Sequence, residues 1–259
     1  MKKSLNIKTN LPAVFTILVL LLLWELLCRT TAIPEFILPS PSAIIYSLTT
    51  NYTLITSHAI TTMIAVAGGL VLAVTVALLA ALAMDRWLLI KRALFPLLVI
   101  SQAVPIFALA PLMLIWFGVG LAPKIFIVAL VCFFPLAVSL VEGLDQVNPE
   151  EIELMQIMQA GSWMIMQQVK FPSALPYFFS GLKIAATYSV LGAIIGEWLG
   201  ARSGLGIYML RAKNSFQTSD VFASIIIVVI LSLLLFKAVE IAGFVVMPWR
   251  REKDLTVED

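Results

Sequence analysis

Three long stretches without a charged residue limit what this chain can fold into. They cover residues 59–84, 93–123 and 125–141. An α-helix needs about 20 consecutive apolar residues to cross the hydrocarbon core of a bilayer. Only helices and closed barrels satisfy every backbone polar group inside lipid, and runs of this length match helices. The sequence therefore predicts an all-α membrane protein.

The composition agrees with this prediction. Hydrophobic residues make up 61% of the chain and charged residues 12%, whereas a soluble domain has roughly 45–50% apolar and about 25% charged residues. Three further apolar stretches carry only isolated charges, so we predict about six transmembrane helices. These further stretches are 11–28, 171–200 and 221–247.

Basic residues predict the orientation of the spans, because loops rich in Lys and Arg stay on the cytoplasmic side of a membrane. With six spans, ten basic residues fall on one side and five on the other, and the richer side contains both termini and residues 148–170. We therefore expect a cytoplasmic N-terminus over residues 1–10, a transmembrane permease domain over 11–248 and a cytoplasmic tail over 249–259. The first span contains Glu25 and is expected to be retained rather than cleaved as a signal peptide.

One polar segment interrupts this apolar chain, and its sequence predicts a helix over about 148–166. Asn148 is a favoured N-cap residue and Pro149 suits the first helical position. Acidic side chains in the first turn face the positive end of the helix dipole, and methionines with a tryptophan offer an adaptable surface to another protein. The alternative is an interfacial helix on lipid, which the early glutamates disfavour. The segment contains Glu150, Glu151, Glu153, Met155, Gln159, Ala160, Gly161 and Trp163.

The polar segment resembles the cytoplasmic coupling loop of bacterial ABC-importer permeases, whose signature reads Glu-Ala-Ala-x3-Gly-x9-Ile-x-Leu-Pro. Glu153 takes the position of the signature's Glu, and Pro172 belongs to its tail. Leu154 and Met155 replace the two alanines, and Gln159 stands at the position of the glycine. The resemblance implies that this segment docks in a groove of an ATPase subunit.

The resemblance extends over nearly the whole chain. Residues 38–42 and 181–200 are similar to the corresponding segments of the nitrate, sulfonate and taurine permease family. Within that family, residues 181–206 and 216–222 look most like permeases for the thiamine precursor hydroxymethylpyrimidine or related aminopyrimidines. The fold that this implies is a type I ABC-importer permease of the bacterial inner membrane. A permease for sulfonates, taurine or nitrate is the alternative within the family.

The family resemblance also implies partners. Two permease copies form a translocation path at their interface, two ATP-binding subunits drive it, and an extracytoplasmic solute-binding protein delivers the cargo. The chain has no nucleotide-phosphate loop of the Gly-x4-Gly-Lys-Ser/Thr kind. ATP and Mg²⁺ are therefore expected on the partner ATPase, with no cofactor on this chain, which acts as a transport subunit and not as an enzyme.

Polar side chains inside the spans are candidates for the translocation path, because such residues are rare in lipid. The same groups also hold helices together, and this packing role is the commoner one. Tyr188 is able to stack on an aromatic ring. Glu197 is placed to gate the path or to meet the binding protein, and the alternatives are that its carboxylate reaches the outer interface or pairs with Arg202. Gly192 and Gly196 allow a close helix contact, either between two copies or within one chain. The path candidates are Ser101, Gln102, Thr187, Tyr188, Ser189 and Glu197.

Other functional classes fit the sequence less well. An ion-coupled secondary transporter usually carries acidic residues near the membrane midplane, where this chain has almost none, and it stays the alternative from another class. A channel needs rings of polar or charged residues along its pore. The single histidine, His58, and the separated Cys28 and Cys132 give no metal-ligand spacing. A net charge of +2 indicates no nucleic-acid partner.

Overall fold

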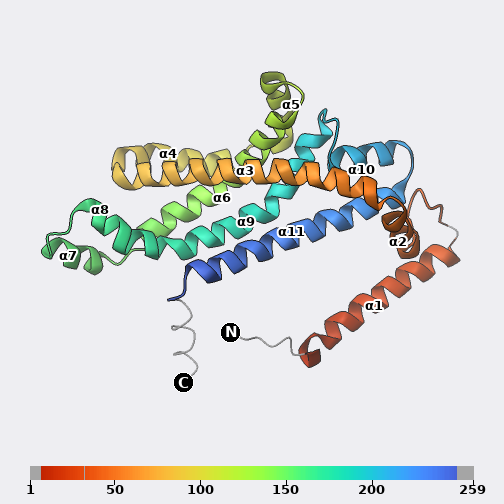
Figure 1. Cartoon of the computed structure of the whole chain (residues 1–259), viewed down its shortest axis with the longest axis horizontal. Coiled ribbons are helices and arrows are strands. Elements are labelled where there is room, and N and C mark those ends of the chain that lie inside the picture. Colours follow the sequence, from red (N-terminus) through yellow and green to blue (C-terminus); the bar gives the residue numbers. More distant parts are fainter. Residues whose placement is uncertain (1–6, 32, 250–259) are drawn as a thin grey trace.

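The computed structural model describes residues 7–31 and 33–249 of the 259-residue chain. Every regular element in these two ranges is helical, as the sequence predicts. Long helices lie side by side along the longest dimension of the molecule (Figure 1). The four longest are α3 (Tyr52–Arg86), α6 (Leu121–Asp145), α9 (Phe171–Trp198) and α11 (Thr218–Val246).

Small side chains allow α3, α6 and α9 to approach one another closely. The buried residues of α3 recur at intervals of three or four residues, so they share one face of that helix. In lipid, close packing of small residues takes over from the hydrophobic effect as the force between helices. One core therefore runs along these three helices, and it includes Ala65, Ala73, Ala77 and Ala81 of α3, Val128, Cys132 and Leu136 of α6, and Ala185, Val190 and Ala193 of α9.

Short helices cap the two ends of this bundle (Figure 1). One end, which we call the α10 end, carries α2 (Pro41–Thr50) and α10 (Leu205–Asn214). The opposite end, which we call the α7 end, carries α7 (Pro149–Ile157), α8 (Ser162–Ile165) and the π-helical turn η1 (Met166–Lys170). All described helices of the chain except α1, α4 and α5 thus belong to the bundle or to its two caps.

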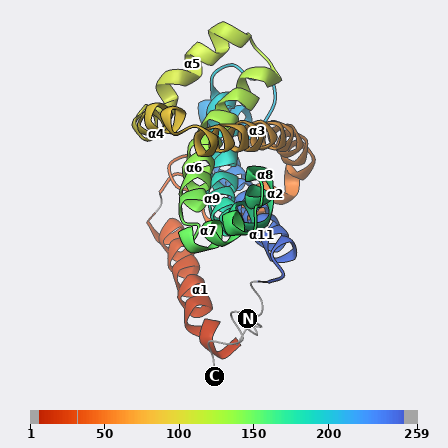
Figure 2. The same cartoon turned by 90° about the vertical axis from the view of Figure 1, so that its left-hand side faces the viewer.

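The remaining helices lie on the flanks. Helix α1 (Ile7–Thr30) and helix α5 (Ile106–Phe117) lie on opposite sides of the bundle in both views (Figures 1 and 2). Helix α4 (Leu88–Ser101) follows α3 through a tight reversal at Trp87 and packs along it. The flank formed by α4 and α5 positions the hollow described below.

The third predicted span, residues 93–123, is broken rather than straight. Helices α4 and α5 meet at an angle of 105°. Pro105 is the N-cap of α5, and the residue before a proline avoids the helical conformation, which explains why the break falls here. The break leaves the backbone from Gln102 to Pro105 outside any helix.

The number of spans is slightly lower than predicted. Within the described ranges, four helices are long and apolar enough to cross a membrane, and the bent pair α4 and α5 gives a fifth if it is counted as one span. The predicted first span, residues 11–28, lies in α1, which is not one of the four. The predicted terminal segments, 1–10 and 249–259, fall largely outside the described residues.

Gly69 marks a close approach of α3 and α6 and gives a test of the fold. A Cβ at Gly69 would lie 2.4 Å from Val128 Cβ and 3.0 Å from the Ile125 carbonyl oxygen. Overpacking a core costs about 1–3 kcal/mol, so Gly69→Ala is expected to lower the thermal unfolding midpoint of the detergent-solubilised protein. Gly68→Ala is the matched control, because its Cβ would meet only the flexible side chain of Ile125. Equal shifts in the two variants would contradict the packing of α3 on α6.

Candidate functional site

The polar segment begins as the sequence predicts but is not one helix. The Asn148 side chain accepts a hydrogen bond from the Glu150 N–H at 3.0 Å, and Pro149 occupies the first turn. In place of a single helix over 148–166, α7 ends at Ile157 and α8 begins at Ser162. The chain therefore turns in the middle of the predicted helix.

A left-handed residue causes this turn. Gln159 has a φ of 58°, its N–H donates to the Gln156 carbonyl, and the Ala160 N–H donates to the Met155 carbonyl, both at 2.9 Å. These two bonds form a Schellman motif, in which the left-handed position is usually glycine because a Cβ crowds the following carbonyl oxygen. Gln159 is also the residue at the glycine position of the coupling-loop signature, so the turn supplies a physical reason for that glycine.

Helix α7 exposes the apolar residues that a helix normally buries. None of its side chains is buried in this chain, and Ile157 and Met158 are 78% and 70% exposed. Trp163 beyond the turn is 70% exposed. A helix of nine residues is not stable in water by itself, and a contiguous exposed apolar patch marks a contact surface for another molecule. We call residues 150–163 the docking segment.

The structure places most of the predicted segment residues on the surface. Glu150, Glu151, Glu153, Gln159, Gly161 and Trp163 are exposed, while Met155 and Ala160 are partly buried. Leu154 and Ile157 are exposed as well, and the prediction did not include them. Their spacing of three residues on an otherwise polar helix was the available signal.

Two ion pairs lie at the α7 end of the bundle, close in sequence to the docking segment. Lys170 Nζ of η1 lies 2.7 Å from Asp85 Oδ1 at the end of α3, and Lys91 of α4 pairs with Asp145 of α6. A pocket of about 490 Å³ lies beside the Lys170 pair, with Trp163 in its wall. The π-helical turn that carries Lys170 continues directly into α9, and such turns often occur at functional sites.

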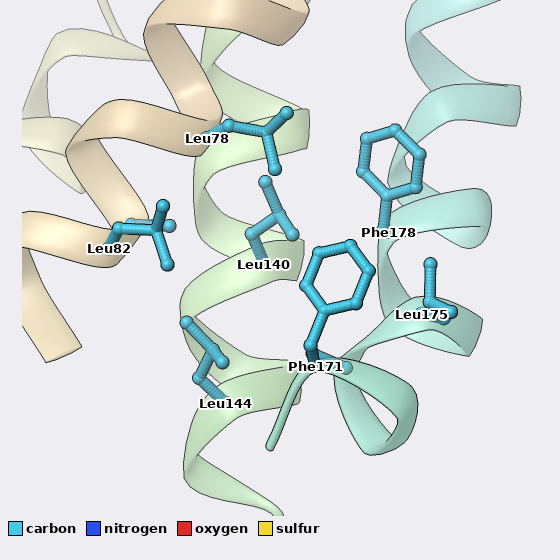
Figure 3. Close-up of a pocket in the computed structure, with 9 residues that line it drawn as sticks. Leu78, Leu82, Leu140, Leu144, Phe171, Leu175 and Phe178 are labelled. Carbon is cyan, nitrogen blue, oxygen red and sulfur yellow. The ribbon is translucent and has the colours of Figure 1, made fainter. Parts of the chain in front are cut away.

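An apolar seam joins the start of α9 to the core. Phe171 and Phe178 of α9 face Leu82 of α3 and Leu140 of α6 around a pocket of about 80 Å³ lined only by apolar side chains (Figure 3). Pro172, a predicted segment residue, lies in the first turn of α9. The start of α9, which follows the docking segment in the chain, therefore packs against side chains of α3 and α6.

A larger hollow of about 740 Å³ lies where α4 and α5 meet. Three predicted path residues, Ser101, Gln102 and Tyr188, all line it. Phe107 of α5 and Phe134 of α6 add two aromatic rings to its wall. Non-helical backbone inside a membrane is tolerated where it lines a cavity. The hollow is therefore the reason why the third span can break at this depth.

The hollow combines a few polar groups with aromatic faces. Ser101 Oγ donates to the Leu98 carbonyl at 2.7 Å and keeps its lone pairs as acceptors. The Gln102 side chain is exposed, and its amide both donates and accepts. Tyr188 is 50% exposed. Small-molecule sites are typically apolar with a small number of placed polar groups, and this arrangement suits a flat heterocycle with exocyclic polar atoms.

Two other predicted path residues of α9 do not line the hollow. The Thr187 hydroxyl is exposed and donates to the Lys183 carbonyl at 3.1 Å. The Ser189 hydroxyl is fully buried and donates to the Ala186 carbonyl at 2.7 Å. Both bonds stay within the helix, which is the local use that Ser and Thr often make of their hydroxyl groups.

Gly192 and Gly196 make their close contact within the chain. A Cβ at Gly192 would lie 3.2 Å from Val131 Cγ2, and a Cβ at Gly196 would lie 3.2 Å from Lys124 Cα. Both neighbours belong to α6. Of the two contacts that the sequence left open, the structure therefore shows the one between α6 and α9.

Glu197 lies at the α10 end, away from the hollow. It is fully buried, and its Oε1 lies 3.6 Å from Lys124 Nζ. Its ion-pair partner is thus Lys124 rather than Arg202, whose carbonyl accepts a hydrogen bond from Arg211 at 3.3 Å. Lys124 was not among the predicted residues, although a lone lysine at the start of an apolar span indicates that an acidic partner lies on another helix.

Comparison with known proteins gives a consistent result. Residues 73–251 match the family model described as binding-protein-dependent transport system inner membrane component. The chain is 36% identical over 222 residues to a probable ABC transporter permease protein of Haemophilus influenzae, covering 86% of this chain and 91% of that protein. It is 35% identical over 243 residues to the formylaminopyrimidine transport permease protein ThiX of Halalkalibacterium halodurans, covering 93% and 96%.

A solved structure shares the fold. The crystal structure of an amino acid ABC transporter with histidines matches with a TM-score of 0.61 and 16% sequence identity, covering 78% of this chain and 97% of that one. At this identity the likeness concerns the fold alone.

The turn at Gln159 predicts a stability change of known sign. Gln159→Gly is expected to stabilise the turn by about 1 kcal/mol, because glycine adopts the left-handed conformation without a Cβ clash. Hydrogen exchange of the Ala160 amide should then slow by about fivefold. Gln156→Gly is the matched control, since glycine inside α7 costs about 1 kcal/mol and should speed the same exchange. Faster exchange in Gln159→Gly would contradict the left-handed turn.

Proposed function

The chain belongs to the family of binding-protein-dependent transport system inner membrane components, and we propose that its cargo is a small aminopyrimidine of the thiamine-precursor class. As an ABC-importer permease it is a multi-pass membrane protein. Members of this family are transport subunits and not enzymes, and membership implies association with ATPase and substrate-binding subunits. The cargo, the number of copies and the orientation in the bacterial inner membrane are parts of the proposal.

The single observation that carries the cargo proposal is the composition of the hollow. Its aromatic side chains, Phe107, Phe134 and Tyr188, offer ring faces for stacking, and the Gln102 amide offers a donor and an acceptor to ring nitrogens and amino groups. The relative ThiX is named for formylaminopyrimidine transport, which is cargo of this chemistry.

The same hollow disfavours the two alternatives. Among the described residues that line it, no Lys or Arg occurs, whereas a sulfonate, taurine or nitrate carries a negatively charged group that such residues would pair. No Asp or Glu lines it either, and an ion-coupled secondary transporter usually places acidic residues beside its broken helices. A neutral heterocycle fits the lining better than an anion or a coupling cation does.

Two copies of the chain would enclose the translocation path. In one chain the hollow is open to the surface, and apolar side chains around α4 and α5 are exposed beside it. A second copy facing the first would cover both hollows and bury these side chains, which include Ile100, Phe107, Ile115 and Trp116. In this arrangement the translocation path would form only where two copies of the chain meet.

The docking segment would contact the ATPase. Its exposed apolar residues need a partner, and the basic loops on the same side of the membrane favour a cytoplasmic position for the α7 end and for both termini. Two ATP-binding subunits would carry ATP and Mg²⁺ and close against each other. Lys170 and Phe171 would pass that movement to α3 and α9. The α10 end would then face the extracytoplasmic solute-binding protein.

Uptake by the reconstituted complex tests the cargo. Proteoliposomes with this chain, its ATPase and its binding protein are expected to accumulate labelled formylaminopyrimidine only with ATP, and unlabelled hydroxymethylpyrimidine but not taurine should compete. Tyr188→Leu is expected to reduce uptake by about tenfold, whereas Tyr188→Phe keeps the ring and most of the uptake. ATP-dependent uptake of taurine would contradict the proposed cargo but not the role of the chain as an importer permease. Pyrimidine uptake that needs no ATP would favour an ion-coupled transporter.

A charge reversal tests the docking segment. Glu153 is exposed near the positive end of the α7 dipole, so Glu153→Lys is expected to lower ATP-dependent uptake by about tenfold. Glu240→Lys is the control, because it makes the same charge change on an exposed part of α11. The assembled complex is quantified in both variants by co-purification. Wild-type uptake by the Glu153→Lys complex would remove this residue from the coupling surface.

A further inference from the structure

Side chains of two spans hold the first backbone N–H groups of α10. The first N–H groups of a helix have no partner within the helix, and a nearby side chain of the same segment usually accepts from them. At α10 the acceptors come instead from α3 and α9. The three bonds are Gly204 N–H to His58 Nδ1 at 2.9 Å, Leu205 N–H to Thr62 Oγ1 at 2.9 Å and Gly206 N–H to Glu197 Oε2 at 2.7 Å.

Glu197 is the centre of this arrangement. Its Oε1 accepts a hydrogen bond from the Thr62 hydroxyl at 2.9 Å and faces Lys124 Nζ. Lys124 is only 4% exposed and donates to the Ser203 carbonyl at 2.6 Å. A buried charge is costly unless it is paired and hydrogen-bonded, and these contacts offset that cost. We call the set the Glu197 clasp, which consists of His58, Thr62, Lys124, Glu197 and residues 203–206.

Two glycines make room for the clasp. A Cβ at Gly204 would lie 2.0 Å from Glu197 Oε1, and a Cβ at Gly206 would lie 2.7 Å from the Ile194 carbonyl oxygen. Gly204 also has a φ of 127°, which side chains rarely allow. Glycine is therefore required at these two positions because α9 and its buried Glu197 carboxylate approach the loop closely, and at Gly204 also because of the backbone conformation.

The contacts continue across α10 to two more helices. The His58 ring stacks on Tyr208 with ring centroids 5.3 Å apart. Burial and the neighbouring Asp220 carboxylate raise the pKa of Tyr208 to about 12. Asp220 of α11 accepts hydrogen bonds from Asn51, at 2.9 Å, and from Ser47 of α2. Asp220 thus ties α11 to α2 and Asn51 close to Tyr208 of α10.

The opposite end of α9 leads to the docking segment. Residues Ser162–Trp198 form one continuous helical stretch, and Figure 1 shows α9 running from α8 to the α10 end. The clasp therefore attaches α10 to the far end of the same element that begins at the ATPase-facing surface.

We propose that the Glu197 clasp makes α10 and α9 move as one body, so that contact of the solute-binding protein with α10 is transmitted along α9 to the docking segment. The proposal rests on the proposed function. Glu197 acts in it as a positioning residue that touches neither cargo nor nucleotide. Its buried carboxylate is used to hold α10 rather than to gate the path.

Two variants open the clasp in different ways. Glu197→Gln removes the charge opposite Lys124, and Thr62→Val removes the hydroxyl that joins Glu197 to Leu205 while leaving the ion pair in place. Each has a matched control that removes the same group elsewhere. Glu240→Gln acts on an exposed pair with Lys237, and Thr75→Val removes a hydroxyl of α3 that bonds only the Val71 carbonyl of its own helix.

ATPase rates of the complex in nanodiscs provide the first readout. The binding protein is loaded with formylaminopyrimidine, and rates are measured with and without it. In both clasp variants the basal rate is expected to stay within about twofold of wild type, while stimulation by the loaded binding protein falls by about fivefold or more. The controls should keep both rates. Unchanged stimulation in both clasp variants, or a parallel loss of basal rate and of assembled complex, would overturn the proposal.

Hydrogen exchange provides a second readout that needs no cargo. In the same complexes without binding protein, the clasp variants are expected to exchange faster both in α10, residues 205–214, and in the segment that leads into the start of α9, residues 158–170. Faster exchange confined to α10 would overturn transmission along α9. A wild-type complex that formylaminopyrimidine fails to stimulate would count against the cargo, and the exchange result would then decide on the clasp separately.

Discussion

Inside a bilayer, polar groups must find their partners within the protein, and this constraint explains where the chain departs from plain apolar helices. The backbone freed at the break before Pro105 lines a hollow that also holds Gln102. The carboxylate of Glu197 is matched by Lys124 and by the backbone N–H of Gly206 in α10. Both departures are supported by the close packing of α6 on α9. The polar features therefore lie beside the packed core. They mark the positions that are candidates for a function other than spanning the lipid.

The sequence predicts those parts of the structure that depend on local pattern. Length and hydropathy predict the helical membrane class, and Asn148 with Pro149 predicts the start of α7. Polar residues in apolar spans predict Ser101, Gln102 and Tyr188 as candidates, which the structure brings into one hollow. Pro105 turns the chain by 105° where hydropathy shows one uninterrupted run, so the third span counts as a span only if α4 and α5 are taken together.

Long-range pairings are what a single sequence does not reveal. Arg202 is close to Glu197 along the chain, yet the partner is Lys124 at the start of another span, because helix packing and not sequence distance decides which charges meet. The left-handed turn at Gln159 is not predicted from the sequence for another reason. Glutamine rarely adopts the left-handed conformation, so the residue types of this segment favour a continuous helix. Only the glycine of the signature indicated a turn. The bonds from Gln159 and Ala160 to the last turn of α7 hold the strained residue in place.

Helix α9 links the docking segment, the hollow and the Glu197 clasp, which it contacts at different positions along its length. Phe171 at its start meets the core beside the docking segment, Tyr188 faces the hollow, and Glu197 holds α10. Between these points Gly192 and Gly196 press the helix against α6. A bend in the middle of α9 would have to separate this contact and draw Tyr188 away from Gln102. The contact of Gly192 and Gly196 with α6 therefore keeps α9 straight between η1 and the α10 end, so a movement at one end of this helix would reach the other end.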